Sequence, residues 1–104
     1  MDLQMRTLRV TSADGRELDR KVTKDILLEL FIQVGPVRNI VLKPSFAFIE
    51  FQDVESVAYA IAAMDGVQLF GRTLNLEPKI RTEEVFRYLK NLRLYEQRPE
   101  LFGH

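Results

Sequence analysis

Cysteine and tryptophan are absent from this 104-residue chain, and its only histidine is the last residue, His104. Without cysteine the chain has no disulfide framework, no thiol nucleophile and no cysteine-ligated metal site. A single histidine at a chain end, where disorder concentrates, is a poor candidate for a general base or a zinc ligand. The composition therefore predicts a domain that works without a metal ion or another cofactor.

An excess of either charge is also absent, because 15 basic and 15 acidic side chains give a formal net charge of +0. A domain that binds the phosphate backbone usually carries more basic than acidic residues. Neutrality leaves nucleic-acid binding open but removes its largest source of affinity. Any nucleic acid that binds this chain is therefore predicted to bind weakly.

No apolar run approaches the length that spans a membrane, and no signal-peptide pattern opens the chain. A hydrophobic fraction of 46% and a charged fraction of 29% are those of an ordinary globular protein. At this length the chain forms one domain with a single modest core. We expect an intracellular domain that contacts no membrane.

Hydrophobic periodicity divides residues 5–78 into two successive strand–helix–strand units. Alternation predicts strands over 5–11, 37–43, 46–51 and 73–77. Helical spacing predicts two helices, one from its cap Thr23 to the stop at Gly35, and one from its cap Asp53 to Met64. Two such units form an α+β ferredoxin-like βαββαβ sandwich, in which a four-stranded antiparallel sheet carries both helices on one face. The other face is free to bind.

Beyond this domain, Thr82 caps a predicted C-terminal helix over residues 82–97, and a flexible tail follows over 98–104. Apolar residues at helical spacing form a stripe on this helix that needs a covering surface. The stripe has two alternative destinations, the free face of the sheet or another chain. Phe86 lies off the stripe and is predicted to contact a protein partner.

The most informative segment is 46–51, where aromatic residues alternate with small or aliphatic ones. Its inward side is apolar throughout, whereas Phe46, Phe48 and Glu50 point to the other face. Two aromatic rings on the open face of a sheet form a platform on which unstacked bases can lie. The alternative is that another part of the chain covers both rings, as happens to most aromatics in a small domain.

Residues 6–77 resemble the RNA recognition motif (RRM) family. Its third-strand motif reads Lys/Arg-Gly-aromatic-Gly/Ala-aromatic-aliphatic-x-aromatic, and the aligned residues here are 44–51. Both stacking positions match, as Phe46 and Phe48, whereas Pro44 and Ser45 replace the basic residue and the glycine. The resemblance implies RNA binding on the sheet, with Phe46 and Phe48 stacking bases. A site of this kind would use Arg9, Lys43 and Asn75 to contact phosphates or base edges.

Two departures from the family pattern point to weak RNA binding. Arg9 stands where the first strand normally offers a third aromatic ring, although a guanidinium can stack on a base as well. The basic hairpin that commonly wraps RNA is shortened to little more than residues 43–45.

Residues 27–37 narrow the resemblance, because they are similar to the first-helix signature of the first RRM of splicing factor 3b subunit 4. The RNA-binding subunit of the nuclear exosome targeting complex carries the same signature. In those relatives the helical side docks a protein partner. Here Leu28 and Ile32 fall one turn apart on the outer face of the first helix, where this family has polar residues. Tyr59 and Ala62 occupy positions on the second helix where charged residues are usual.

These four residues and Phe86 are the predicted protein interface, since clustered exposed apolar side chains usually mark one. Singly exposed apolar residues are nevertheless normal. Alternatively, the predicted C-terminal helix covers these side chains. We therefore predict a degenerate, non-enzymatic RRM that assembles with a protein in an RNA-processing complex. Its partner is expected to be another protein, such as a second RRM, or a second copy of the chain. No small-molecule substrate is expected.

Three other functions share parts of this sequence pattern. The first alternative is an RRM that binds single-stranded RNA on its sheet. A peptide-binding class of RRMs captures tryptophan-bearing peptides, but it needs Arg-x-Phe where this chain has Leu74 two residues after Arg72. Acylphosphatases share the strand–helix order, but their phosphate loop is glycine-rich, and Asp14 here would repel phosphate.

The setting of the domain is predicted from resemblance alone. Its neutral, interaction-prone character resembles the RRM subunits of the nematode germline complex that processes small-RNA (piRNA) precursors. The expected location is therefore the nucleus, cytoplasmic ribonucleoprotein granules, or both.

Overall fold

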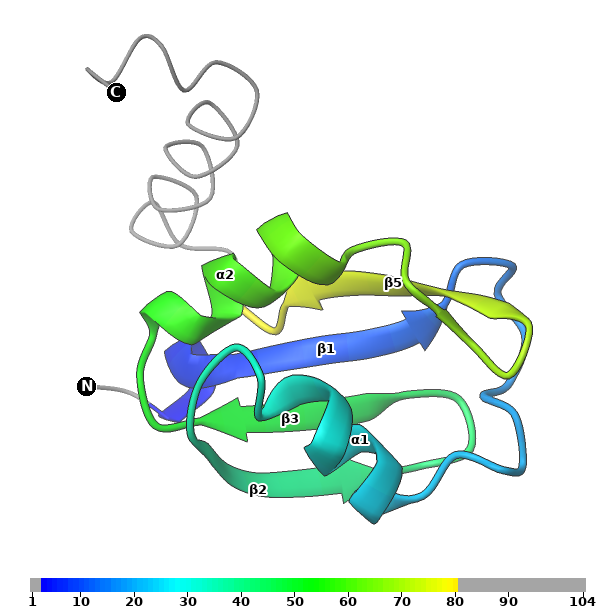
Figure 1. The fold of residues 1–104 in the computed structure, drawn as a ribbon, viewed down its shortest axis with the longest axis horizontal. Coiled ribbons are helices and arrows are strands. Elements are labelled where there is room, and N and C mark those ends of the chain that lie inside the picture. Colours follow the sequence, from blue (N-terminus) through cyan, green and yellow to red (C-terminus); the bar gives the residue numbers. More distant parts are fainter. Residues whose placement is uncertain (1–2, 81–104) are drawn as a thin grey trace, which may run out of the picture.

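Two strand–helix–strand units follow one another in the computed structural model, which describes residues 3–80 (Figure 1). The elements are, in order, a short 3-10 turn η1 (Leu3–Arg6), β1 (Thr7–Ser12), α1 (Lys24–Phe31), β2 (Val37–Leu42), β3 (Ala47–Phe51), α2 (Glu55–Met64), β4 (Gln68–Leu69) and β5 (Arg72–Pro78). The predicted helix over 82–97, with Phe86, and the tail over 98–104 lie outside the described residues. Among the described residues, no helix is long and apolar enough to cross a membrane.

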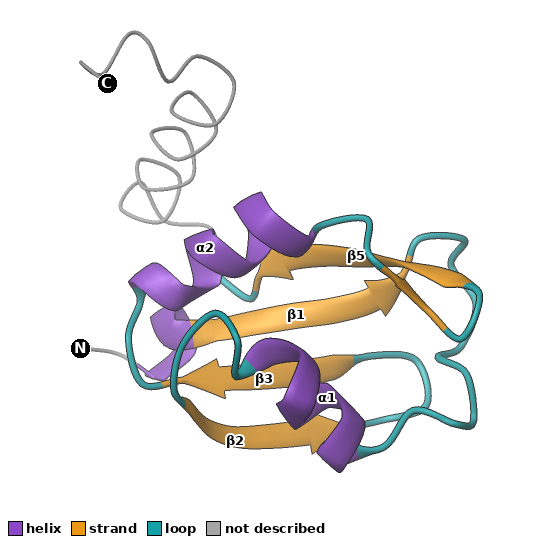
Figure 2. Ribbon diagram, in the orientation of Figure 1, coloured by secondary structure: helices purple, strands orange, loops and turns teal. Residues whose placement is uncertain are grey.

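The strands form one sheet in the order β2-β3-β1-β5-β4, and every neighbouring pair is antiparallel. Both helices lie on the same face of the sheet, α1 over the β2 side and α2 over the β5 side (Figure 2). The predicted ferredoxin-like α+β fold is therefore confirmed. The structure adds β4, a two-residue edge strand that forms a hairpin with β5.

The core lies between the sheet and the helices, and periodicity predicted most of it. Thr23 caps α1 as expected, since its side-chain oxygen accepts a hydrogen bond of 3.2 Å from the backbone N–H of Ile26. Leu27 and Phe31 on this helix are fully buried, and Leu30 packs partly buried against the same cluster. The strand residues of the hydrophobic core are Leu8, Val10, Ile40, Ala47, Ile49, Phe51, Leu74 and Leu76.

The start of α2 differs from the prediction that Asp53 caps it. The cap position is Val54, which makes no side-chain capping bond, and only the backbone carbonyl of Asp53 accepts from Ser56 N–H. Val54 is instead buried in the core, so its packing rather than a polar cap positions this end of the helix. Gly35 follows α1 at a point so close to α2 that a Cβ atom there would collide with the Ser56 side chain.

The start of β1 also differs from the prediction, because Met5 and Arg6 belong to the turn η1 rather than to the strand. This turn folds over the first strand residue, and the hydroxyl of Thr7 donates a hydrogen bond of 2.8 Å to the carbonyl oxygen of Leu3. Alternation with the inward Leu8 and Val10 predicts that Thr7 faces the open side of the sheet, but this turn buries it. The open face therefore begins at Arg9.

Candidate nucleic-acid interface

The open face of the sheet carries the two predicted rings side by side. Ala47, Ile49 and Phe51 of β3 are fully buried toward the helices, so the alternation of the strand turns Phe48 to the opposite face. The ring centroids of Phe46 and Phe48 are 5.0 Å apart, with their planes tilted by 52°. Both rings are partly exposed. This geometry offers two neighbouring surfaces on which flat groups can stack.

A row of paired residues crosses the sheet through the second ring. Strand register places Val41 opposite Phe48, Phe48 opposite Arg9, and Arg9 opposite Glu77. The Nη1 atom of Arg9 donates to Oε1 of Glu77 at 2.8 Å. The predicted third stacking group is therefore held in an ion pair beside the platform. The carboxylate of Glu77 also brings a negative charge to the face where RNA phosphates would approach.

Lys79 is a part of this face that the sequence prediction missed. Its Nζ atom lies 4.4 Å from the centroid of the Phe48 ring, within the range of a cation–π contact. The signal was present in the alternation, since Asn75, Glu77 and Lys79 follow one another at intervals of two. The predicted strand ends at Glu77, whereas β5 continues to Pro78, so Lys79 follows directly after the strand.

The other two predicted RNA contacts lie at the margins of the same face. The backbone N–H of Lys43 donates to the carbonyl oxygen of Phe46 at 2.9 Å, so this exposed residue lies next to the Phe46 backbone in the β2–β3 turn. Asn75 is exposed on β5, opposite Thr11 of β1. The structure thus brings Arg9, Phe46, Phe48 and Asn75 onto one face, with Lys43 in the turn at its edge.

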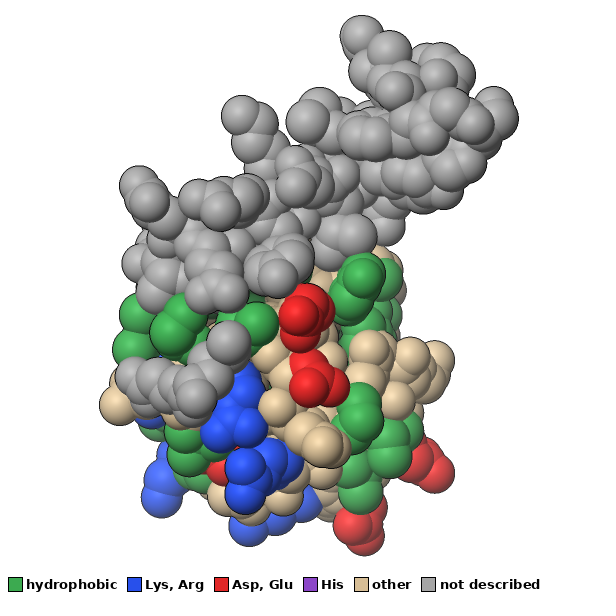
Figure 3. All heavy atoms as spheres, turned by 90° about the vertical axis from the view of Figure 1, so that its left-hand side faces the viewer, with side chains coloured by type: hydrophobic (Ala, Val, Ile, Leu, Met, Phe, Trp, Pro, Cys, Tyr) green, Lys and Arg blue, Asp and Glu red, His purple; other side chains and the backbone are tan. Residues whose placement is uncertain are grey.

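Charge at one end of the molecule, the left-hand end of Figure 1, is mixed rather than predominantly basic. At the end of the molecule seen in Figure 3, basic and acidic side chains lie next to each other with hydrophobic side chains around them. An extended basic track is not present in this view, which agrees with the formal net charge of +0. Among residues 3–80, no group of His, Asp or Glu side chains could hold a metal ion.

The helical face presents the other predicted surface. Leu28 is 37% exposed, Ile32 54% and Tyr59 48%. The N–H of Ile32 donates to the carbonyl oxygen of Leu28 at 2.8 Å, so these two side chains lie one helical turn apart. Ala62 differs from the prediction, because its small side chain is partly buried against the core. Three of the four described residues therefore remain accessible to a partner.

Comparison with known proteins identifies relatives of this fold and sequence. The profile of a family described as "RNA recognition motif" matches residues 16–75. The splicing regulator RBM11 of Mus musculus is 43% identical over 67 residues, which are 58% of this chain and 28% of that protein. RNA-binding protein 7 of Danio rerio is 33% identical over 75 residues, or 65% of this chain and 30% of that protein. The matches thus span less than a third of these relatives' length.

Solved structures give the same result for the fold. The Nab3 RRM, from a structure titled for cis element recognition of non-polyadenylated RNAs, aligns with a TM-score of 0.64 and 28% identity. The alignment covers 75% of this chain and 99% of that one. The Rna15 RRM with bound RNA aligns with a TM-score of 0.57 and 28% identity over 80% of this chain and 95% of the other.

Proposed function

This chain belongs to the RNA recognition motif family, and from that premise we propose that it acts mainly as a protein-interaction module of an RNA-processing complex, with weak binding of single-stranded RNA on its sheet. The observation that carries the proposal is a set of exposed apolar side chains on the helical face, with Leu28 and Ile32 one turn apart on α1 and Tyr59 on α2. They are 37–54% exposed, so each forgoes part of the about 1.5–3 kcal/mol that full burial of a large apolar side chain contributes. A partner that covers these side chains recovers part of this free energy, which is why exposed apolar surface of this kind marks interfaces.

The state of the sheet face supports the second half of the proposal. Lys79 covers part of the Phe48 ring, and Arg9 is paired with Glu77. A base that stacks on Phe48 has to displace the ammonium group, and a phosphate that binds Arg9 has to compete with a carboxylate. Both contacts subtract from the affinity that the rings supply. The sheet is therefore proposed to bind RNA weakly rather than to be the main site of the domain.

The names of the relatives support the proposed setting. They include a splicing regulator and splicing factor 3B subunit 4 of Homo sapiens, which is 34% identical over 67 residues. We accordingly propose a non-enzymatic role in RNA processing and a nuclear location. The same proposal has three narrower forms. They are assembly with another RRM or a second copy of the chain, a place in ribonucleoprotein granules, and a role in small-RNA processing.

The docking proposal is tested with the variant Leu28→Glu/Ile32→Glu. Light scattering measures self-association, and quantitative pull-down from cells of the source organism measures capture of other proteins. The matched control is Lys24→Gln/Gln33→Glu, which makes the same change of charge at exposed polar positions of the same helical segment. We expect the apolar-to-acidic variant to lose self-association or specific partners that the control retains. A monomeric wild type whose variant still captures every partner would refute the proposal.

A second candidate function is sequence-tolerant binding of single-stranded RNA as the main activity. It is favoured by the partly exposed rings of Phe46 and Phe48, whose centroids are 5.0 Å apart. Stacking contributes roughly 1–3 kcal/mol per base. The variant Phe46→Ala/Phe48→Ala should therefore lose at least about tenfold in RNA affinity while it keeps its fold. Fluorescence anisotropy with a labelled oligonucleotide and circular dichroism measure the two quantities. Absence of binding by the wild type would end this alternative.

A further inference from the structure

One end of the sheet carries an organised surface that the proposed functions do not use. The loop of residues 13–23, the β2–β3 turn and the β4–β5 turn meet at this end (Figure 1). The loop is fastened to β5 by the N–H of Ala13, which donates to the Thr73 carbonyl at 2.8 Å. It is fastened to the β2–β3 turn by the N–H of Leu18, which donates to the Pro44 carbonyl at 2.8 Å. These bonds hold a long loop in one conformation, and ordered long loops are commonly functional.

The β4–β5 turn places an aromatic ring where backbone geometry disfavours one. Leu69 pairs with Arg72, and the two residues between them, Phe70 and Gly71, have φ angles of 52° and 77°. A two-residue hairpin turn of this kind prefers Asn, Asp or Gly at both central positions, because a side chain at positive φ is strained. Phe70 accepts this strain and yet leaves its ring 42% exposed. Strain retained at an exposed position is a reason to look for function there.

One cation lies close to this ring, since Lys21 Nζ is 5.8 Å from the Phe70 centroid. Lys21 also lines a hollow of about 510 Å³, together with Arg16 and Arg72 among others. Arg72 closes one side of the hollow, since its Nη1 donates to the Glu17 carbonyl at 3.0 Å and its Nε lies 3.8 Å from an Asp19 carboxylate oxygen.

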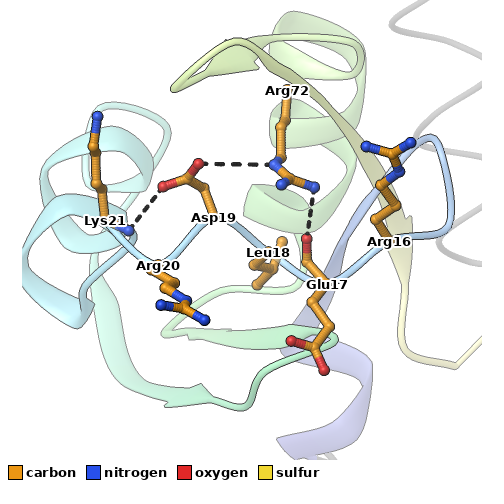
Figure 4. Close-up of a pocket in the computed structure, with 7 residues that line it drawn as sticks. All are labelled: Arg16, Glu17, Leu18, Asp19, Arg20, Lys21 and Arg72. Carbon is orange, nitrogen blue, oxygen red and sulfur yellow. Dashed lines mark hydrogen bonds and ion pairs between the residues drawn. The ribbon is translucent and has the colours of Figure 1, made fainter.

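Two of the three acidic residues of the loop, Asp14 and Asp19, are engaged in holding its shape. Asp19 faces Arg72 and accepts from the Lys21 backbone N–H at 2.9 Å, whereas the Lys21 and Arg16 side chains extend away from it (Figure 4). Asp14 accepts from the Ser12 hydroxyl at 2.6 Å and from the Arg16 N–H at 2.9 Å. These hydrogen bonds lower the pKa of Asp14, with the Ser12 bond as the larger cause. Arg16 also lies 3.9 Å from an Asp14 carboxylate oxygen, in an exposed pair. The hollow is nevertheless lined by four basic and two acidic side chains, so its lining carries a net positive charge.

We propose that this end of the sheet is a second contact for single-stranded RNA, in which Phe70 stacks a base while Arg16 and Lys21 hold phosphate groups. An exposed ring among cations is the combination that binds single strands without regard to sequence. The same end carries Lys43 and the turn that leads into Phe46, so a strand that leaves the first ring of the platform meets this surface. The inference rests on the proposed RNA binding of the domain, but it assigns that binding to different residues.

The experiment measures binding of labelled mixed-sequence RNAs of 4 and 12 nucleotides to the full chain by fluorescence anisotropy. Phe70→Asn removes the ring and suits the positive φ, so it is not expected to unfold the turn. Lys21→Gln removes one proposed phosphate contact. Its control is Arg38→Gln, an equal charge change at the other end of the sheet, where β2 begins opposite the end of β3. Phe46→Ala/Phe48→Ala reports on the platform separately.

We expect Phe70→Asn to weaken binding of the 12-nucleotide RNA by about tenfold or more, through the lost stacking. Lys21→Gln should weaken it and reduce the dependence on salt, whereas Arg38→Gln should change little. If only Phe46→Ala/Phe48→Ala weakens binding, the inference is wrong and the platform proposal stands. If only Phe70→Asn and Lys21→Gln weaken it, the inference holds and the platform is not the site.

Two further outcomes would also overturn the inference. A wild type that binds neither RNA, even at low salt, contradicts both RNA proposals and leaves the helical face untouched. The second outcome is that an acidic peptide of glutamate residues competes for binding as well as unlabelled RNA does. If Lys21→Gln also weakens binding of the peptide while Phe70→Asn does not, this end is a site for acidic protein segments instead.

Discussion

At the scale of single residues, the sheet face differs from an open stacking platform through two charged contacts. Lys79 lies 4.4 Å from the Phe48 centroid, and Arg9 donates to Glu77 at 2.8 Å. Each contact is exposed to solvent and contributes at most about 1 kcal/mol to stability. These contacts affect RNA binding more than folding, because they engage the Phe48 ring and the Arg9 guanidinium, which RNA would contact.

Glu77→Gln is predicted to raise the affinity for single-stranded RNA by roughly three- to tenfold. The substitution removes a negative charge from the face and releases the Arg9 guanidinium for a phosphate or a base. Fluorescence anisotropy at low salt measures the change. Glu29→Gln, which makes the same charge change at an exposed position of α1, is the control. A gain of equal size in the control would attribute the effect to net charge alone.

At the scale of secondary-structure elements, the packing of α1 and α2 is set by small residues as well as by large ones. Gly35 lets the segment after α1 approach Ser56 of α2, and α2 buries Ala58 and Ala60 besides its larger side chains. The spacing of the two helices in turn determines how Leu28, Ile32 and Tyr59 are presented to a partner.

Gly35→Ala is predicted to lower the free energy of unfolding by about 1–3 kcal/mol, as expected for an added methyl group in a packed region. The new Cβ would overlap the Ser56 side chain. Urea denaturation followed by circular dichroism measures the loss. The double variant Gly35→Ala/Ser56→Ala should recover part of it, because the overlapping hydroxyl is gone. A single variant as stable as the wild type would contradict the close approach of the segment after α1 to Ser56 of α2.

At the scale of the whole molecule, the balance of charge limits what the domain can do alone. Fifteen basic and fifteen acidic residues leave no net attraction for a polyanion, so RNA binding depends on a few local cations and exposed rings. The helical face has no such restriction, because burial of apolar area does not need net charge.

The affinity for single-stranded RNA is predicted to fall only moderately with salt. About three phosphate contacts would give a slope of roughly −2 for the logarithm of the binding constant against that of salt concentration. Anisotropy titrations between low and physiological salt measure this slope. A slope steeper than about −4 would reveal a more extended basic track than the described surface contains, and no dependence would contradict any phosphate contact.

Much of the fold could be predicted from the sequence because the regular elements have fixed periods. Alternation in β3 predicts that Phe48 and the buried Ile49 lie on opposite faces of the sheet. Helical spacing in α1 distinguishes the buried Leu27 from the exposed Leu28. These assignments depend on the pleat and the helical turn, which are local properties of the backbone. Termini of elements were less certain, as Thr7 and Asp53 demonstrate, because turns and core packing compete with local signals there.

The sequence by itself therefore determined the order of elements, the two faces of the sheet and the apolar positions on the helical face. Only the tertiary structure decided which charged groups meet on those faces. Arg9 and Glu77 are 68 residues apart, and strand register alone makes them neighbours. The same holds for Lys21 and Phe70, which the folding of a loop against a turn brings together. Periodicity is encoded over a few residues, whereas such contacts depend on how distant segments pack.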